Sequence, residues 1–592
     1  MRIAVLVKQI PAFEEMTLGA DGRLVRSGLE LEMNAYCRRA VAKAVELLIE
    51  HGGSATVVTM GPRSADAVLR EALAWGHDRG VQIDGVHVCD ARLSGSDTLA
   101  TARALAVVVS DLGPFDLVLT GRNSVDADTG QVGPQLAALL DLPFATGVRE
   151  LHVDAAAGTA SVRCEHDDGW VRADVTLPAV LSTAERLTDP CKVGAERRSA
   201  VPATAIRIVT ADDAGPGPWG EAASATRVGP TRRHAVRRDR RLLTGGVEEQ
   251  VDAALALLRE RGALASERWG AVTEDVPANG GGPAVVGVLV EPDRTHLTRE
   301  LLGAAAVLAT GIGASVAAIG PGPHDVALLA TWGADEVHIL AGSLVEEDIA
   351  AGVAAWAEQA GAAVVLAPST AWGREVAARV AAVRGAGLVG DACELALDGD
   401  RLLAWKPAFG GQLVAAITCT SPLQMATVRA GALPRRRPRR ACATQREIAL
   451  APRGRITVHA RERDDDLDVL ADAPAVIAVG AGVAPDEHAL LAPLAAALSA
   501  ELAATRKVTD KGWLPRARQI GITGRSIAPC LYVAVGLSGK FNHSVGHCRA
   551  GTVLAINHDP EAPVFGTADI GIVGDWREVV AALAAALTAV PA

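Results

Sequence analysis

The sequence predicts an α/β fold made of two similar parallel-sheet domains of the nucleotide-binding type and a third α/β domain at the C-terminus. Three observations lead to this prediction. Short aliphatic runs alternate with Ala-rich stretches of helical period along the chain, as in parallel sheets covered by helices. The order of landmarks in the first part recurs after residue 283. With 592 residues, the chain is also too long for a single hydrophobic core.

The first copy begins with the aliphatic run RIAVLV at 2–7, which we expect to form the first strand. The run ATVVTMG at 55–61 predicts a second strand, and SADAVLREALAWG at 64–76 predicts the helix that follows it. FDLVLTG at 115–121 predicts a third strand, and GQVGPQLAALL at 130–140 the next helix. This order is typical of strand–helix–strand units with a parallel sheet.

The second copy repeats these elements in the same order. AVVGVLVEP at 284–292 matches the first strand, 314–337 matches the second strand with its helix, and 362–383 matches the third pair. Both copies carry Gly-Pro after the second strand, an Asp at the helix entry and Trp-Gly at the helix end. We therefore expect an internal duplication rather than a general α/β likeness.

Between and after the copies lie segments that read as connectors. The segment after the first copy contains an amphipathic helix at 247–261 and ends in NGGGP at 279–283. The basic run at 435–440 reads as a solvated connector or hinge. We expect these domains: a first α/β domain at 1–204, an arm and linker at 205–282, a second α/β domain at 283–445 and the C-terminal domain at 446–592.

Composition excludes several classes of function. A net charge of −11 argues against nucleic-acid binding through bulk charge. The nine Cys are scattered without a CxxC pair, so we expect no metal or iron–sulfur site, reduced thiols and a cytoplasmic protein. No apolar run reaches 18 residues, so no membrane span is predicted.

Polar and Gly-rich segments follow the most apolar runs of the last domain. LYVAV at 531–535 is followed by GLSGKFNH, and TVLAI at 552–556 is followed by NHDPEAP. Two further loops, VGAGVAPDE at 479–487 and QIGITGRSIAP at 519–529, lie beside predicted strands. Ligands of open α/β sheets bind beyond the carboxyl ends of strands, so these loops predict a nucleotide-sized crevice. No catalytic motif accompanies them, which indicates that the chemistry belongs to a bound cofactor.

The first domain carries its own candidate nucleotide loop at 121–140, between a predicted strand and a helix. Gly130, Gly133 and the Thr129 hydroxyl stand where a helix N-terminus could bind phosphate. Asp126 and Asp128 could accept ribose hydroxyls or hold a magnesium-bound phosphate. A structural Gly-rich turn with an Asp N-cap explains the same residues, and the residues alone leave both alternatives open.

Taken together, these segments resemble an electron transfer flavoprotein whose beta and alpha subunits are joined in one chain. The N-terminal half resembles the beta subunit through MNAYC at 33–37, TMGP and the loop GRNSVDADTGQVGP. The C-terminal half resembles the alpha subunit at 519–575, through QIGITG, GLSGKFNH, LAINHDPEAPVF and ADIGIVGDW. The resemblance implies that the last domain is a Rossmann-like FAD-binding domain. It also accounts for the duplication, because the two subunits of that family share a fold.

The resemblance implies FAD in the last domain and assigns residues to it. Three of these residues would tune the flavin: Arg506 beside the isoalloxazine ring, Thr523 near flavin N5 and His543 near the N1/C2 edge. The charge of Arg506 and a donor from His543 would stabilise the negative charge of a reduced flavin. No catalytic residue and no metal ligand is expected. The expected FAD-binding residues are Thr505, Arg506, Gln519, Ile520, Gly521, Thr523, Gly524, Ser538, Gly539, Asn542, His543, Asn557, Asp575 and Trp576.

The resemblance also implies a second nucleotide in the first half, either AMP or a second FAD. Its expected lining is Asn34, Ala35, Tyr36, Cys37, Met60, Asp126, Asp128, Thr129, Gly130, Gln131, Val132 and Gly133. Two departures from the family pattern matter. Ala481 replaces an Arg of the family's GGRG turn, and 189–196 lacks the apolar loop tip that binds acyl-CoA dehydrogenases in many members. The donor dehydrogenase is therefore left open.

Three functions compete at this point. The first is an electron carrier that accepts electrons from a flavin-containing dehydrogenase and passes them through FAD to a quinone oxidoreductase or a similar acceptor. Its partners would be redox proteins and no nucleic acid, and the protein itself could bind peripherally to a membrane oxidoreductase. The second is an electron-bifurcating flavoprotein that oxidises NADH at a second FAD. The third is a nucleotide-binding protein without a redox role.

Overall fold

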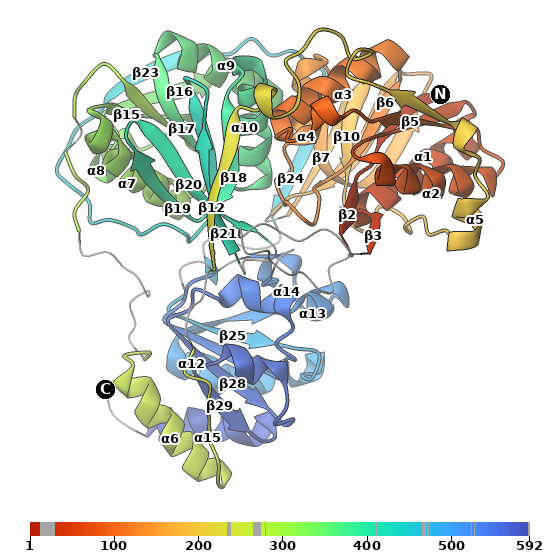
Figure 1. The fold of residues 1–592 in the computed structure, drawn as a ribbon. Coiled ribbons are helices and arrows are strands. Elements are labelled where there is room, and N and C mark those ends of the chain that lie inside the picture. The colour runs from red at the N-terminus through yellow and green to blue at the C-terminus, as the bar shows by residue number, and fades with distance from the viewer. Residues whose placement is uncertain are drawn as a thin grey trace.

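Three α/β units make up the chain in the computed structural model, two of them side by side and the third below them (Figure 1). The structure describes residues 1–592 except 12–29, 168, 234–237, 265–273, 279, 409–412, 464–468, 471–472, 522–523, 526 and 590–592. Each unit contains parallel strands covered by helices, so the predicted fold class is confirmed.

The first unit contains a ten-stranded sheet in the order β11-β5-β4-β1-β6-β10-β7-β8-β9-β24. The strands from β11 to β7 are parallel, and those from β7 to β24 are antiparallel. The strands are β1 (Arg2–Leu6), β4 (Ser54–Met60), β5 (Ile83–Val88), β6 (Leu117–Gly121), β7 (Phe144–Asp154), β8 (Thr159–Glu165), β9 (Gly169–Thr176), β10 (Ala179–Thr183), β11 (Ile206–Val209) and β24 (Ile456–Arg463). The helices are α1 (Ala35–His51), α2 (Asp66–His77), α3 (Thr98–Leu112), α4 (Val132–Leu139) and α5 (Ala195–Ser199), and a short hairpin joins β2 (Gln9–Pro11) to β3 (Leu31–Met33).

The second unit contains a seven-stranded parallel sheet in the order β18-β22-β17-β14-β15-β16-β23. Its strands are β14 (Val285–Leu289), β15 (Ser315–Pro321), β16 (Glu336–Ala341), β17 (Ala362–Pro368), β18 (Gly387–Ala392), β22 (Gln424–Val428) and β23 (Thr444–Ala449). Its helices are α7 (Thr295–Ile312), α8 (Val326–Trp332), α9 (Glu346–Gln359) and α10 (Ala371–Arg384). The first sheet from β7 to β11 has the same order of corresponding strands, which confirms that the two domains are similar.

Beside the second sheet lies an antiparallel sheet in the order β12-β21-β20-β19. Its strands are β12 (Thr226–Arg233), β19 (Glu394–Asp398), β20 (Arg401–Ala408) and β21 (Leu413–Cys419). β12 follows the first copy in the chain but pairs with β21 of the second, whereas β24 follows the second copy but pairs with β9 of the first. Figure 1 shows the exchange as a yellow strand among green ones and a light-blue strand beside orange ones. Each half therefore completes a sheet of the other.

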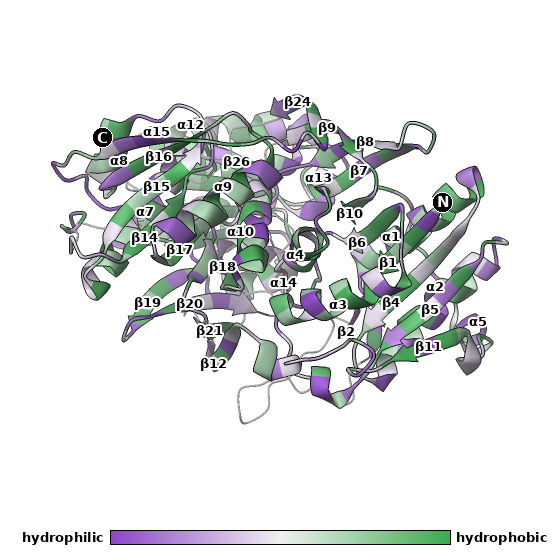
Figure 2. Cartoon of the chain, turned by 90° about the horizontal axis from the view of Figure 1, so that it is seen from above, coloured by the Kyte–Doolittle hydropathy of each residue, from purple (hydrophilic) through white to green (hydrophobic). Residues whose placement is uncertain are grey.

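The third unit contains a parallel sheet in the order β13-β29-β28-β27-β25-β26. Its strands are β13 (Arg241–Leu242), β25 (Ala475–Val479), β26 (Ala500–Ala504), β27 (Leu531–Val535), β28 (Thr552–Asn557) and β29 (Ile570–Val573). Its helices are α12 (Ala492–Leu498), α13 (Arg506–Asp510), α14 (Phe541–Ser544) and α15 (Trp576–Thr588). The strands β25, β27 and β28 are fully buried, as expected for parallel strands covered on both faces. In the second unit, β14 and β15 are buried after their first residues, and Figure 2 shows both largely in the green of hydrophobic residues.

The segment predicted as arm and linker at 205–282 joins three sheets in its described parts. β11 extends the first sheet, β12 pairs with the second half, and β13 extends the third sheet. Helix α6 (Val247–Glu260) then packs Val251, Leu255 and Leu258 into the core beneath α15. The segment is thus integral to all three units. The predicted domain limits stay a prediction, and β24, within the predicted C-terminal range, lies in the first sheet.

The basic run at 435–440 pairs with acidic residues near the end of this connecting segment. Arg436 contacts Glu274 at 2.7 Å, Arg437 contacts Asp275 at 2.9 Å, and Arg439 reaches Asp335 at 3.3 Å. The run therefore fastens the end of the connecting segment to the second unit. Among the described residues, no helix is both long enough and apolar enough to cross a bilayer.

The exchanged strands predict how the chain responds to a cut at 280–283, where Gly281 is exposed. After cleavage at an inserted protease site, we expect the two fragments to stay associated at submicromolar concentration. The reason is that β12, β13 and α6 of one fragment and β24 of the other remain in sheets and cores of the partner. Size-exclusion chromatography checks this result, with denatured cleaved protein as the control. Separate elution of the fragments under native conditions would contradict it.

Candidate functional site

The carboxyl edge of the third sheet gathers three of the predicted loops. Because the strand order is β28-β27-β25, the loops that follow these strands start next to one another. A Cβ on Gly480 would lie 2.2 Å from the Gly536 carbonyl oxygen, and a Cβ on Gly482 would lie 2.8 Å from it. The two backbones therefore approach so closely that only glycine fits, and the edge presents backbone rather than side chains.

The loop at 519–525 is tied to helix α13. Gln519 is fully buried, and its side-chain oxygen accepts a hydrogen bond from the Thr509 hydroxyl at 2.7 Å. Ile520 is buried, Gly521 has a φ of 132°, and a Cβ on Gly524 would lie 2.4 Å from the Gln519 carbonyl oxygen. Thr523, predicted near flavin N5, lies outside the described residues together with Ile522.

Three aromatic rings pack behind this loop. The His543 Nδ1 lies 3.1 Å from the Ile520 carbonyl oxygen, which can only accept, so Nδ1 carries the proton. The Tyr532 hydroxyl therefore donates to His543 Nε2, at 2.7 Å. Burial lowers the pKa of His543 to about 4, so its ring is neutral near pH 7. The His547 ring stacks on Tyr532 with centroids 4.2 Å apart.

His543 thus uses both ring nitrogens on protein groups, and its predicted role at the flavin N1/C2 edge stays a prediction. Ser538, in the segment that follows β27, is exposed. The next residue, Gly539, has a φ of 70°, and a Cβ on it would lie 2.2 Å from Val564 Cα. The Asn542 backbone lies in the first turn of the short helix α14, but its side chain is not among those described.

The last three residues predicted to bind FAD, Asn557, Asp575 and Trp576, lie near the ends of β28 and β29. Asn557 donates to the Leu537 carbonyl at 3.0 Å and accepts from the Asp559 amide at 3.0 Å, which joins the ends of β27 and β28. Asp575 caps α15, and Trp576 is buried in the first turn of that helix. Their contacts with a ligand stay predictions.

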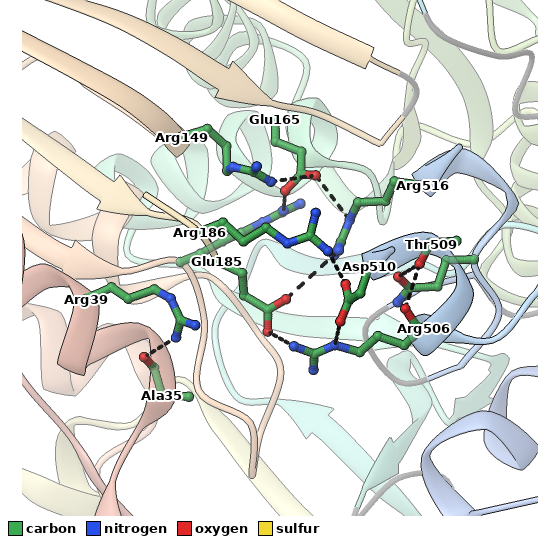
Figure 3. Close-up of polar contacts among 12 residues, drawn as sticks. Ala35, Arg39, Arg149, Glu165, Glu185, Arg186, Arg506, Thr509, Asp510 and Arg516 are labelled. Atoms are coloured by element: carbon green, nitrogen blue, oxygen red, sulfur yellow. Dashed lines mark hydrogen bonds and ion pairs between the residues drawn. The ribbon is translucent and has the colours of Figure 1, made fainter. Parts of the chain in front are cut away.

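Arg506, the predicted flavin-tuning cation, lies in an ion-pair cluster between the third and first units (Figure 3). Thr505 precedes it as the N-cap residue of α13. Arg506 donates to Glu185 at 2.9 Å and to Asp510 at 3.3 Å, and Arg186 pairs with the same Asp510. Figure 3 shows Arg516 reaching Glu165 nearby, at 3.3 Å. Charged side chains therefore line the contact between these units.

The second predicted nucleotide site lies at the carboxyl edge of the first sheet, where β4, β1 and β6 are neighbours. Lys8 follows β1 and donates to Asp126 at 2.8 Å and to Ser124 at 3.0 Å. Asn34, at the start of α1, donates to the Asn123 carbonyl at 2.9 Å and accepts from the Val125 amide at 3.3 Å. The segments predicted to line the site are thus brought together.

The remaining predicted residues divide between this edge and the contact with the second unit. Ala35 begins α1, and the next two residues, Tyr36 and Cys37, pack against Gly121. Met60 is the last residue of β4. Asp128 has a φ of 46°, and its carboxylate accepts a hydrogen bond from the Asn123 side chain. Thr129 and Gln131 face Gly390 of the second unit, and Gln131 also accepts from Thr98 at 2.6 Å. Gly130 has a φ of 64°, whereas Val132 and Gly133 begin α4 beside Phe144.

The sequence reasoning missed Lys8, Ser124 and Asn123, which the structure places among the predicted residues. Lys8 carried a usable signal, because a cation directly after the first strand of a parallel sheet lies at the edge where ligands bind. Among the described residues, no group of three or more His, Cys, Asp or Glu side chains is placed to hold a metal ion.

The fold defines an α/β protein with a duplicated core of the nucleotide-binding type, and the predicted loops gather at the carboxyl edges of two of its sheets. A model of the electron transfer flavoprotein domain matches residues 21–213 and again 287–453. A model of the electron transfer flavoprotein FAD-binding domain matches residues 469–547. The chain therefore belongs to the electron transfer flavoprotein family, as the resemblance implied.

Relatives include both subunits of such proteins. The alpha subunit of electron transfer flavoprotein from Thermoanaerobacterium thermosaccharolyticum is 34% identical over 301 residues, which is 48% of this chain and 91% of that subunit. The beta subunit from the same organism is 32% identical over 265 residues, 44% of this chain and 99% of that subunit. Protein FixB from Bradyrhizobium diazoefficiens is 33% identical over 344 residues, 54% of this chain and 93% of FixB. The predicted joining of beta and alpha subunits in one chain is confirmed.

The ion pair between Glu185 and Arg506 predicts a salt-sensitive contact between the first and third units. Replacing Glu185→Gln leaves Arg506 with Asp510 on its own helix. A partly exposed pair contributes about 0.2–1 kcal/mol, so we expect amide hydrogen exchange at 505–512 to become roughly two- to threefold faster at low salt. Salt near 0.5 M should remove the difference between the proteins because it screens the pair. Glu50→Gln on the exposed face of α1 is the control, and unchanged exchange in Glu185→Gln would contradict the prediction.

The buried His547 predicts a loss of stability in acid. Burial, His543 and Arg238 hold the pKa of His547 well below its usual value, whereas the unfolded chain takes up the proton below pH 6.5. Stability is therefore lost as pH falls from 6.5 towards the native pKa. His547→Phe keeps a stacked ring and should reduce the loss between pH 7 and pH 5 by about 2 kcal/mol. Thermal unfolding over this pH range is the measurement, with the exposed His77→Phe as control, and an unchanged pH profile would contradict the prediction.

Proposed function

We propose that this protein is an electron carrier that accepts electrons from flavin-containing dehydrogenases and passes them, through FAD held by the third unit, to a quinone oxidoreductase or a similar acceptor. Electron transfer as such follows from the family to which the chain belongs. The convergence of Gly480, Gly482 and Gly536 at the carboxyl edge of the third sheet is the observation that carries the FAD assignment.

The residues present at this edge suit a dinucleotide. At Gly480, Gly482, Gly536 and Gly539 backbone segments approach neighbouring protein closely, because a Cβ at each would lie within 2.9 Å of neighbouring protein atoms or meet strain from a positive φ. A pyrophosphate needs the same close approach to backbone without side chains. The polar loop after β27 contains Gly536 and Gly539, and the polar loop after β28 lies next to it along the edge. We therefore propose that the fourteen residues named above from Thr505 to Trp576 hold FAD.

The chain's own groups would act by binding and by electrostatics. When bound, the flavin supplies the capacity to take up and release electrons. Arg506 contributes a guanidinium at the contact between the units, where Glu185 and Asp510 partly compensate its charge. Gln519 and Thr509 fix the loop at 519–525, and His543 stays neutral because its ring is buried. None of these side chains needs to form a covalent bond for the protein to carry electrons.

For the first unit we propose a second nucleotide at the edge formed by β1, β4 and β6. Lys8 is the cation there that could face a phosphate, although Asp126 pairs with it in the structure. We propose AMP as this ligand for a simple carrier. A second FAD would instead favour the alternative function, oxidation of NADH with division of its electrons. We also propose a cytoplasmic location, which is supported by the nine free cysteines.

A count of bound nucleotides tests the proposal. The purified protein, expressed with ample riboflavin, is denatured, and the released FAD and AMP are separated by chromatography and quantified per chain. The proposal predicts one FAD and one AMP, together with negligible NADH oxidation. Two FAD and no AMP, with NADH oxidation, would establish the alternative, and protein without FAD would contradict both functions.

A further inference from the structure

Arg238 belongs to the segment between the two halves, yet its side chain is buried in the third unit. Only 7% of the side chain is exposed. Its Nη2 donates to the carbonyl oxygens of Cys548 and Ala550, each at 2.9 Å. Its Nη1 donates to the Asp569 carboxylate at 2.8 Å and lies 3.5 Å from the Gly551 carbonyl oxygen. One guanidinium therefore contacts three backbone carbonyls of the turn at 548–551 and the buried carboxylate of Asp569.

The turn that Arg238 holds packs directly against the loop proposed to bind the flavin. A Cβ on Gly546 would lie 2.4 Å from the Gly521 amide nitrogen and 2.7 Å from the Arg525 carbonyl oxygen. The Ile527 amide donates to the Gly546 carbonyl at 2.8 Å, and His543 donates to the Ile520 carbonyl at 3.1 Å. The segment 543–551 and the loop around 519–527 thus form one packed body, and displacement of the turn moves the loop.

We infer that Arg238 is a positioning residue for the flavin: by binding the carbonyls of the turn at 548–551 it fixes the two loops proposed to hold the ring. The segment between the halves then contributes a buried side chain to FAD binding in addition to linking the halves. This inference rests on the proposed function and deepens it.

The chemistry of the contact requires arginine. A guanidinium carries five N–H donors in a rigid plane, so it can bind the turn carbonyls and the Asp569 carboxylate together. A lysine ammonium is a point charge and cannot span the same acceptors. Burial of a cation is costly unless it is paired, and Asp569, which is 1% exposed, supplies the pair. The cost is offset only when all of these contacts form.

Arg261 offers a matched control in the same network. Its Nη2 lies 3.1 Å from the same Asp569, and its Nε donates to the Thr552 hydroxyl at 3.1 Å. Arg261 therefore shares the counter-charge of Arg238, and the contacts described for it do not include the carbonyls at 548–551. Removal of either arginine leaves Asp569 with the other. Arg261→Met also removes an ion pair with Asp239, at 2.6 Å, whereas only the Arg238 variants change the donor to the turn carbonyls.

The experiment compares Arg238→Met, Arg238→Lys and Arg261→Met with the unaltered protein. Recovery of FAD fluorescence on dilution gives the FAD dissociation constant, and hydrogen–deuterium exchange reports on 519–527 and 543–551. Loss of charge-assisted hydrogen bonds to the turn should raise the dissociation constant about tenfold in Arg238→Met. The dissociation constant of Arg238→Lys should lie between those of Arg238→Met and the unaltered protein. Arg261→Met should change the dissociation constant less than about threefold. Faster exchange in both segments should accompany the loss only in the Arg238 variants, with the adenine nucleotide of the first unit unchanged.

Equal loss of FAD in Arg238→Met and Arg261→Met would overturn the inference, because it would assign the effect to the charge on Asp569. Unchanged exchange at 543–551 in the Arg238 variants would overturn it as well. If Arg238→Met does not fold, Arg238→Lys alone decides between these results. Absence of FAD from the unaltered protein would refute the proposed function, whereas the exchange comparison would still show whether Arg238 holds the turn.

Discussion

The reciprocal pairing of β12 with β21 and of β24 with β9 is the constraint on which the arrangement of the two halves depends. Each pair consists of antiparallel backbone hydrogen bonds between segments that lie far apart in the sequence. The exchange sets α4 beside α10, with the Arg379 guanidinium over the Phe144 ring at 5.9 Å. It also brings the loop that contains Gln131 against the second unit, where the Gln131 side-chain amide donates to the Leu388 carbonyl at 3.3 Å. The candidate nucleotide loop of the first unit is therefore closed by the second.

The third unit is joined to the other two by different physical means. On one side, the segment after β12 adds β13 to its sheet, α6 to its core and Arg238 beneath its loops. On the other side, the contact with the first unit includes partly exposed ion pairs around Arg506 and Arg516 and a hydrogen bond from Arg525 to the Asp167 carbonyl. Apolar burial and backbone pairing are stronger than such ion pairs and much less sensitive to salt. The orientation of this unit towards the first half should therefore be the most readily altered feature of the molecule.

Local sequence predicted the central strands because their signal is a continuous apolar run. AVIAV at 475–479 and LYVAV at 531–535 coincide with β25 and β27, and TVLAI at 552–556 lies within β28. The exchanged strands were not predicted. β12 reads TRVGPTRR and β24 reads ITVHARER, and both carry too many polar residues to resemble a buried strand. They are strands because a distant edge offers hydrogen bonds, which no local pattern encodes.

The candidate sites show the same division. Glycines at 480, 521, 524, 536 and 539 could be read from the sequence as points of close backbone approach or positive φ, and the structure has them so. The partners of charged and titratable side chains could not be predicted from the sequence. Arg506 meets Glu185, His543 meets Tyr532, and Arg238 reaches a turn more than 300 residues away. Each of these contacts depends on how separate segments approach one another in three dimensions.

By itself, the sequence determined the α/β class, the duplication, the family and the loops that follow the buried strands, because apolar runs and glycine positions act locally. Only the tertiary structure decided that the halves exchange strands, that the connecting segment is part of all three units, and that Lys8 and Arg238 lie at the candidate sites. The physical reason is that edge pairing and burial of charge depend on neighbours brought together by folding, and those neighbours are distant in the chain.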